Sequence, residues 1–167
     1  MTATYSSIAT TTLSSAASTI TFSSIPSTYT DLRLVVVAKH ATLNNSLLYV
    51  RFNSDTATNY SIISLSAAAN VGTERWNNSA YGYINWRSYL SSTEFILSNV
   101  NIFSYAGSTN KTYLTQVSSD FNGSGSIDNI VGLWRSTSAI TSITVGSESG
   151  NLAIGTTATL YGIKAFA

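Results

Sequence analysis

Short segments in which apolar and polar residues alternate run along the whole chain. The alternation has a period of two residues, which is typical of antiparallel β-strands that bury one face. We therefore predict ten or eleven strands, with approximate bounds 3–12, 18–24, 31–40, 46–53, 59–67, 80–90, 94–104, 111–121, 127–136, 140–146 and 158–166.

Polar turn residues separate these segments. Gly and Asn, which tolerate the backbone angles of tight turns, mark the clearest breaks. No long linker divides the chain and no helical crossover joins the strands, so we expect one domain spanning residues 1–167. Strands of this number and length favour an all-β, antiparallel β-sandwich, jelly-roll-like in topology, over a closed barrel.

Two segments indicate what the sheet faces carry. From 81 to 90 the alternation places Ile84, Trp86 and Leu90 on one face and polar-tipped aromatic residues on the other. That second face would carry Tyr81, Tyr83, Asn85, Arg87 and Tyr89. Both faces of the segment 127–136 are largely apolar, so we expect it to be central in its sheet and covered on both sides.

Hydroxyl side chains dominate the composition, with 29 Ser and 23 Thr, whereas charged residues make up only 9%. Eight basic and seven acidic residues leave a net charge of +1, too little for a long-range field that attracts nucleic acid or an anionic membrane. We expect neither as a partner. Strong helix formers are scarce, so almost no helix is expected. The absence of Cys excludes disulfides, thiolate metal sites and thiol nucleophiles.

The first 30 residues contain no apolar run long enough for the core of a signal peptide, so we expect no export by that route. The longest apolar stretch, Leu34 to Ala38, is far shorter than the ~20 residues that cross a bilayer. A hydroxyl-rich surface nevertheless suits a setting outside the cell. A particle made in the host cytoplasm and released by lysis reconciles these observations.

Several short sequence motifs are distinctive. They are YSSIAT at 5–10, SSIPSTYTDL at 23–32, VGLWRS at 131–136 with ITSI at 140–143, and LYGIK at 160–164. Together they resemble a group of virion structural proteins of tailed bacteriophages, especially phages of cyanobacteria and other aquatic hosts. The resemblance runs from the first predicted strand to the last, although residues 60–115 are not distinctive. It implies a β-rich particle component, found as a small separate protein or as a module of a tail fibre, and supplies no catalytic residues.

Few residues are suited to catalysis. A Ser-His-Asp site would need His40, the only His, and no GxSxG motif accompanies it, so a surface or turn histidine is favoured. Metal binding by His40 lacks partner ligands. Glu74 and Glu94 are the one carboxylate pair considered for glycoside cleavage, and ordinary loop acids are the favoured interpretation. We therefore predict no enzymatic activity, no cofactor and no metal.

The stretch DFNGSG at 120–125 matches the opening of a calcium-binding loop. The twelfth position, however, is Val131 rather than a bidentate acid, and the flanks are predicted strands rather than helices. Only Asp128 could add charge. A plain hairpin loop is therefore favoured.

An aromatic and amide-rich cluster is the remaining candidate site. Its members are Trp76, Asn77, Asn78, Tyr81, Tyr83, Asn85, Arg87 and Tyr89. Flat rings beside amides can stack on and hydrogen-bond a sugar, whereas Tyr, Trp and Arg also anchor protein interfaces. Of three interpretations of this cluster, we rank packing within the chain itself first, a subunit or capsid interface second and glycan binding third. Trp76, Tyr81, Tyr83, Arg87 and Tyr89 are the predicted interface or ligand-binding residues.

The leading hypothesis is a non-enzymatic structural component of a tailed-phage virion, most specifically a head decoration (cement) protein. Its partners would be other virion proteins, either the major capsid protein or tail components. Closed symmetric oligomers suit symmetric particles, so a homotrimer is expected. The alternative is a tail fibre or baseplate domain that binds a host-surface glycan. A glycoside hydrolase or depolymerase using Glu74 and Glu94 ranks last.

Overall fold

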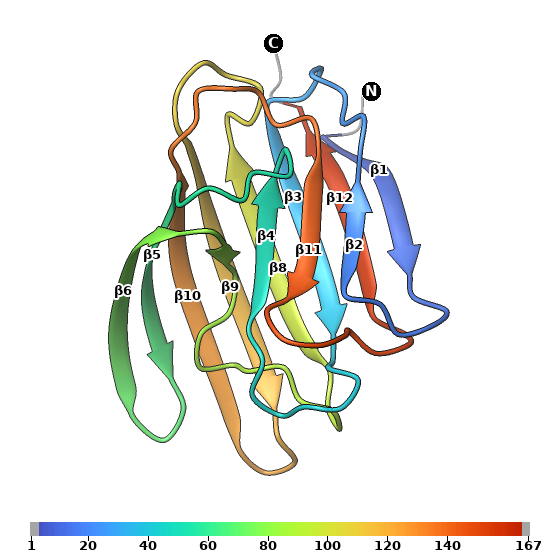
Figure 1. The fold of residues 1–167 in the computed structure, drawn as a ribbon, viewed down its shortest axis with the longest axis vertical. Coiled ribbons are helices and arrows are strands. Elements are labelled where there is room, and N and C mark those ends of the chain that lie inside the picture. Colours follow the sequence, from blue (N-terminus) through green and yellow to red (C-terminus); the bar gives the residue numbers. More distant parts are fainter. Residues whose placement is uncertain (1–3, 165–167) are drawn as a thin grey trace.

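The computed structural model describes residues 4–164, which form two antiparallel β-sheets packed face to face (Figure 1). The strands are β1 (Tyr5–Thr12), β2 (Thr19–Phe22), β3 (Asp31–Ala38), β4 (Leu48–Phe52), β5 (Tyr60–Ala67), β6 (Val71–Ser79), β7 (Gly82–Tyr83), β8 (Ile96–Phe103), β9 (Lys111–Asp120), β10 (Gly125–Trp134), β11 (Ile143–Ser147) and β12 (Thr157–Ile163). The predicted all-β antiparallel sandwich is confirmed. Within the described range no helix could span a membrane.

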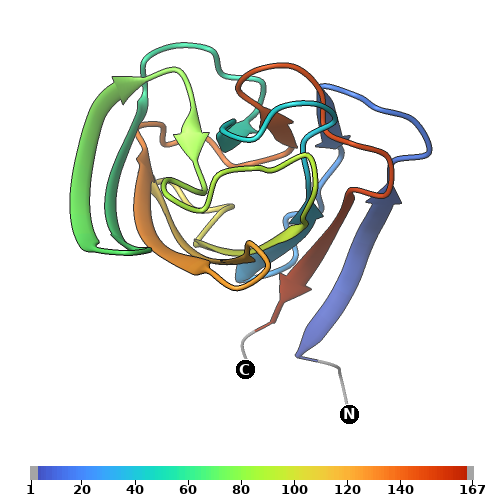
Figure 2. The same ribbon diagram turned by 90° about the horizontal axis from the view of Figure 1, so that it is seen from below.

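The larger sheet has eight strands in the order β1-β12-β3-β8-β9-β10-β5-β6, and the smaller sheet has four in the order β2-β11-β4-β7. Figure 2 shows that the eight-stranded sheet is curved and that its concave side faces the smaller sheet. This arrangement is compatible with a jelly roll. It leaves the strands β1 and β6 at the two opposite edges of the larger sheet.

Most predicted strands coincide with observed ones. Apart from residues 80–90, each predicted segment overlaps one strand, and the ends differ by up to three residues. The predicted terminal segments included residues 3, 165 and 166, which lie outside the described residues. Period-two alternation therefore located the strands wherever one face is buried and the other is exposed.

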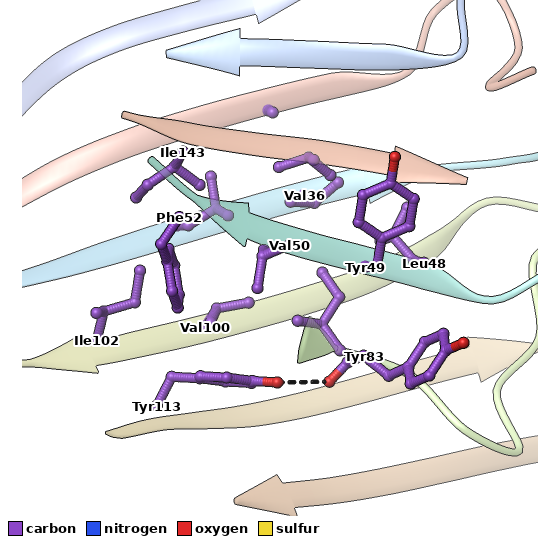
Figure 3. Packing of buried hydrophobic residues seen from close by; sticks show 14 of the residues in the cluster. Val36, Leu48, Tyr49, Val50, Phe52, Tyr83, Val100, Ile102, Tyr113 and Ile143 are labelled. Carbon is purple, nitrogen blue, oxygen red and sulfur yellow. Dashed lines mark hydrogen bonds between the residues drawn. The ribbon is translucent and has the colours of Figure 1, made fainter. Parts of the chain in front are cut away.

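The hydrophobic core lies between the two sheets (Figure 3). On β3 every second residue points inward, so Leu32, Leu34 and Val36 are fully buried. From the opposite sheet, the Phe52 ring lies edge-on to the Tyr113 ring of β9, with centroids 5.9 Å apart. Such aromatic pairs add about 0.5–1.5 kcal/mol to the stabilisation from burying their area.

Two strand glycines lie directly beneath tyrosine rings. Gly132 on β10 and Gly146 on β11 are the cross-strand partners of Tyr113 and Tyr49. A β-carbon at Gly132 would lie 1.9 Å from Tyr113 Cζ, and one at Gly146 would lie 2.5 Å from Tyr49 Oη. Glycine usually weakens a strand, but here the missing side chain lets each ring cover the backbone of its neighbour.

The segment 80–90 was predicted as one strand, and this prediction is wrong. It contains only the two-residue strand β7, followed by an irregular loop. Tyr83 and Asn85, placed by the alternation on a shared face with Tyr89, are buried, whereas Tyr89 is exposed. Asn85 accepts a hydrogen bond from the Leu48 amide at 2.6 Å, so it joins the loop to β4.

Asp128 on β10 holds this loop in place. Its carboxylate accepts hydrogen bonds from the backbone N–H groups of Trp86 at 2.7 Å and Ser88 at 2.9 Å, and from that of Arg87 at 3.1 Å. These are the donors that a strand would have offered to a neighbouring strand. Asp128, considered from the sequence as a source of charge for a calcium loop, is instead buried as a loop anchor.

The strand β6 was not predicted. It forms one edge of the larger sheet and is paired only with β5. Most of its side chains are exposed on both faces, so apolar and polar residues do not alternate along it. An edge strand of this kind carries no periodic signal in the sequence.

The prediction for residues 127–136 is correct in one respect and wrong in another. The strand β10 is central, because it pairs with β9 on one side and β5 on the other. It is not covered on both faces, since Ile127 and Val131 are 52% and 54% exposed. No segment among the residues that the structure describes packs over this side of the sheet.

His40 is buried just after β3, where it forms an isolated antiparallel bridge with Leu152, so the predicted surface or turn position is wrong. Its Nδ1 accepts the backbone N–H groups of Thr42 at 3.0 Å and Leu43 at 2.7 Å. The proton is therefore on Nε2, which donates to the Ser149 carbonyl at 2.5 Å. Both ring nitrogens are used to join two loops.

Acidification is expected to remove a stabilising contribution of Asp55. Its carboxylate accepts hydrogen bonds from the Ala57 amide, the Asn59 side chain and the Trp134 indole. Burial alone would raise the pKa of Asp55, but these hydrogen bonds outweigh burial and lower it. The contribution is therefore fully present above the unfolded-state pKa of about 3.9 and is lost as the pH falls through the lower folded-state pKa. In urea unfolding, the stability difference between the wild type and Asp55→Asn should shrink from about pH 5 to about pH 2; a pH-independent difference would contradict this.

Candidate functional site

A cleft lies between the edge strand β6 and the loop that follows β7. Its volume is about 410 Å³, and it is lined by Ala68, Glu74, Trp86, Arg87 and Tyr89. The last three residues come from the loop, Glu74 comes from β6, and Ala68 lies in the turn between β5 and β6. We call this feature the aromatic cleft.

On the loop side of the cleft, the backbone is held by the Asp128 carboxylate, which accepts hydrogen bonds from the consecutive N–H groups of residues 86–88. Across the cleft, Gly72 of β6 faces the Arg87 side chain. A β-carbon at Gly72 would lie 2.6 Å from Nη2 of Arg87. The guanidinium therefore occupies space that any other residue at this position would fill.

Aromatic rings continue the wall of the cleft. The Trp76 ring on β6 lies edge-on to the Trp86 ring, with centroids 4.9 Å apart. The Tyr83 ring lies 6.0 Å from each of them. Trp76 is 45% exposed and Tyr83 only 3%, so Tyr83 supports the two indole rings from inside while Trp76 extends the exposed surface.

The hydroxyl of Tyr83 donates a hydrogen bond to Oε1 of Glu148 at 2.6 Å. Burial raises the pKa of Tyr83, and the hydrogen bond to Glu148 together with the negative charge of Glu148 raises it further. The hydroxyl therefore stays protonated at neutral pH and remains a donor. This bond fixes the ring that supports Trp76 and Trp86.

Tyr81, another predicted site residue, lies outside the cleft. Its ring packs against Tyr49 with centroids 4.5 Å apart, and the Arg51 guanidinium lies 4.3 Å from the Tyr81 ring centroid. Tyr49 and Tyr83 are cross-strand partners on β4 and β7. The predicted aromatic cluster therefore divides into a cleft with Trp76, Arg87 and Tyr89 around it and a neighbouring stack centred on Tyr81.

The two charged groups of the cleft are Glu74 and Arg87. Within the part of the chain that the structure describes, they form no ion pair with each other, and the Arg87 Nε is buried without a hydrogen-bond partner. Glu94, the other acid of the pair considered for glycoside cleavage, is not among the residues that line the cleft. The cleft thus offers one carboxylate acceptor and one guanidinium donor.

The three asparagine side chains of the predicted cluster are not among the residues that line the cleft. Asn77 lines a shallow hollow on the opposite side of the sheet. Asn78 accepts a hydrogen bond from Arg135, and Asn85 is buried. Sequence reasoning missed Trp86 as a cleft residue because the alternation assigned it to the buried face. It also missed the meeting of Glu74 with Arg87, since β6 has no periodic signal.

A second candidate surface is the side of the eight-stranded sheet that faces away from the smaller sheet, which we call the outer face. Its most exposed large apolar side chains, each at least 37% exposed, are Val37, Ile63, Leu65, Val71, Leu97, Phe103, Ile127 and Val131. Val131 and Ile63 are direct cross-strand partners. A hollow of about 250 Å³ includes both of them together with Arg75.

Residues 4–164 contain no group of three or more His, Asp or Glu side chains that could hold a metal ion. Asp120, at the start of the calcium-like stretch, accepts the Asn122 N–H at 2.9 Å in the hairpin between β9 and β10. This is the geometry of an Asx-turn.

No protein-family model, curated protein or solved structure matches this chain. Its function is therefore inferred from the two surfaces, the outer face and the aromatic cleft.

Proposed function

We propose that the protein is a non-enzymatic structural component of a tailed-phage virion, a head decoration protein that docks on the major capsid protein through its outer face. The observation that carries the proposal is the uncovered apolar surface of the eight-stranded sheet. Ile63, Leu65, Ile127 and Val131 are each more than half exposed and lie on the adjacent strands β5 and β10. Contiguous apolar patches of this kind mark protein contacts more often than free surface.

The chemistry of the outer face defines its partner. Between β8 and β6 the charged side chains of its strands are Arg75 on β6 and Asp120 at the end of β9, and in the middle Asn99, Gln116 and Asn129 lie side by side in register. A complementary surface is therefore apolar, with amide or hydroxyl groups facing this row and an acid facing Arg75. A capsid protein surface with these properties is the proposed occupant.

The size of the outer face is close to that of a stable interface. Six strands from β3 to β6, each eight to ten residues long, give roughly 850 Å² at about 4.8 Å between strands and about 3.3 Å per residue, without counting the area of the protruding side chains. Standard interfaces bury about 800 Å² per partner. The outer face can therefore supply the area of one standard interface.

Phage origin is supported by the sequence phrases at 5–10, 23–32, 131–136 and 160–164. We further propose a homotrimer, because closed rings suit symmetric particles and join two different surfaces of neighbouring copies. The free edges of β1 and β6 are two such surfaces.

Because the net charge is only +1, docking on the capsid depends on apolar contacts. Docking is therefore expected to survive a rise in ionic strength from about 0.05 to about 0.5 M.

The test is Ile63→Glu in the outer face. Ile63 pairs with Arg75, so a glutamate there gains a cross-strand ion pair that supports the fold while placing a charge in the apolar patch. Binding to capsids that lack the protein should weaken by about tenfold or more, measured by co-sedimentation. Thermal melting should change little.

The matched control is Ile154→Glu, because Ile154 is 62% exposed in the loop between β11 and β12 and is not on a strand of the outer face. It should bind capsids as the wild type does. Wild-type binding by Ile63→Glu would exclude docking through the outer face. Sedimentation of the free protein tests the trimer separately.

A further inference from the structure

We infer that the aromatic cleft is a saccharide-binding site for neutral sugars, a role beyond the proposed docking of the outer face. The two surfaces are separate. The cleft lies on the concave side of β6, where Glu74 is the cross-strand partner of the buried Ser64, whereas Arg75 points to the outer face. One copy can therefore dock through the outer face and still present the cleft.

Size and ring geometry fit a small ligand. A volume of about 410 Å³ lies within the usual range of about 300–1,000 Å³ for small-molecule sites. Trp86 and Tyr89 line the cleft, and Trp76 packs edge-on against Trp86 beside it. Flat rings offer apolar faces to the C–H groups of a sugar ring.

The rings are held before any ligand arrives. Asp128 fixes the backbone of Trp86 and Arg87, and the Trp86 ring packs against Trp76 and Tyr83. Tyr83 is itself fixed by its hydrogen bond to Glu148. Preorganised groups lose little conformational freedom on binding, so even a small contact area supports measurable affinity.

Charge selects the class of ligand. Glu74 disfavours anions such as nucleic acid or acidic sugars, and Arg87 disfavours cations. An entirely apolar ligand would leave both charged groups without partners, at a cost of desolvation. A neutral polyol satisfies both groups, because its hydroxyls donate to the Glu74 carboxylate and accept from the Arg87 guanidinium.

A further observation points to a hydroxylated ligand. Three polar atoms around the cleft are buried without a hydrogen-bond partner: Nε of Arg87 and the hydroxyls of Ser64 and Ser66. Ser64 and Ser66 are the cross-strand partners of Glu74 and Gly72, so their side chains lie on the same side of the sheet as the cleft. Unpartnered buried polar atoms are rare in native proteins, and three of the six found among the described residues lie here; the others, on Arg33, Ser98 and Thr115, lie on β3, β8 and β9.

The experiment is saturation-transfer NMR with the full chain and three probe sets: neutral hexose oligosaccharides, uronic-acid oligosaccharides and short peptides. We expect signals from at least one neutral oligosaccharide below about 10 mM. Tyr89→Ala and Glu74→Gln should each weaken that binding by about tenfold or more. Phe95→Ala is the control, because Phe95 and Tyr89 are similarly exposed, at 42% and 40%.

The inference is overturned if no neutral oligosaccharide binds, if only the acidic sugars or the peptides bind, or if both cleft variants bind as the wild type does. Equal loss in Phe95→Ala also overturns it. Melting curves of each variant confirm that the fold is retained, and Glu74→Gln, at an exposed position, keeps the test valid if Tyr89→Ala unfolds. Capsid binding by Tyr89→Ala should be unchanged, so failure of this inference and failure of the docking proposal give different results.

Discussion

Asp128→Ala is expected to lower the free energy of unfolding by about 4 kcal/mol, because it leaves three backbone N–H groups without an acceptor. The Asp128 carboxylate is 1% exposed and binds the amides of Trp86, Arg87 and Ser88. Hydrogen bonds to a charged group contribute about 1.5–3 kcal/mol each, and no other acceptor is at hand for these donors. The loop should therefore detach from β10, and the aromatic cleft should be lost with it.

The measurement is urea unfolding, together with hydrogen exchange of the amides at 86–88. Exchange there should become fast in the variant even where the rest of the protein is protected. The matched control is Asp120→Ala in the adjoining hairpin, where the carboxylate is exposed and accepts one amide, and a loss of about 1 kcal/mol or less is expected. Equal losses for the two variants would show that Asp128 does not anchor the loop.

Gly132→Ala should destabilise the protein by about 3 kcal/mol or more, since a new β-carbon would lie inside the Tyr113 ring. The nearest ring atom is 1.9 Å away, and Tyr113 is fully buried. The ring has little freedom to move, because its hydroxyl donates to the Tyr83 carbonyl at 3.1 Å (Figure 3) and its other side meets Phe52. Thermal and urea unfolding measure the loss.

Two further variants separate a clash from a general effect of alanine. Gly107→Ala lies in a turn, where the nearest atom to a β-carbon is the Ser104 carbonyl oxygen at 3.2 Å, and should cost less than about 1 kcal/mol. Adding Tyr113→Ala to Gly132→Ala removes the obstructing ring, so the double variant should be more stable than the sum of the single losses predicts. Strict additivity would rule out the ring as the cause.

Much of the fold could be predicted from the chain alone, but the candidate site could be predicted only in part. The stretch from Asp31 to Ala38 alternates because one side faces the core, and such alternation is local information. The segment 80–90 alternates as well, yet its backbone donors bind a side chain distant in the sequence, and periodicity does not reveal which acceptor a donor will meet. Trp76, Arg87 and Tyr89 were identified by residue type, whereas Trp86 and Glu74 were not assigned to a shared site.

The sequence by itself determined the β class, the near absence of ionic surface, the lack of cysteine chemistry and most strand positions, because each depends on residue type or on neighbours two positions apart. The tertiary structure alone decided that the outer face is uncovered and that Glu74 and Arg87 share a cleft. Both results depend on contacts between distant segments, and the cleft depends above all on the carboxylate of Asp128 binding the amides of 86–88. A buried carboxylate needs hydrogen-bond partners, and the folded chain can supply them from residues far away in the sequence. A pattern that spans only a few neighbouring residues does not reveal which distant groups these will be.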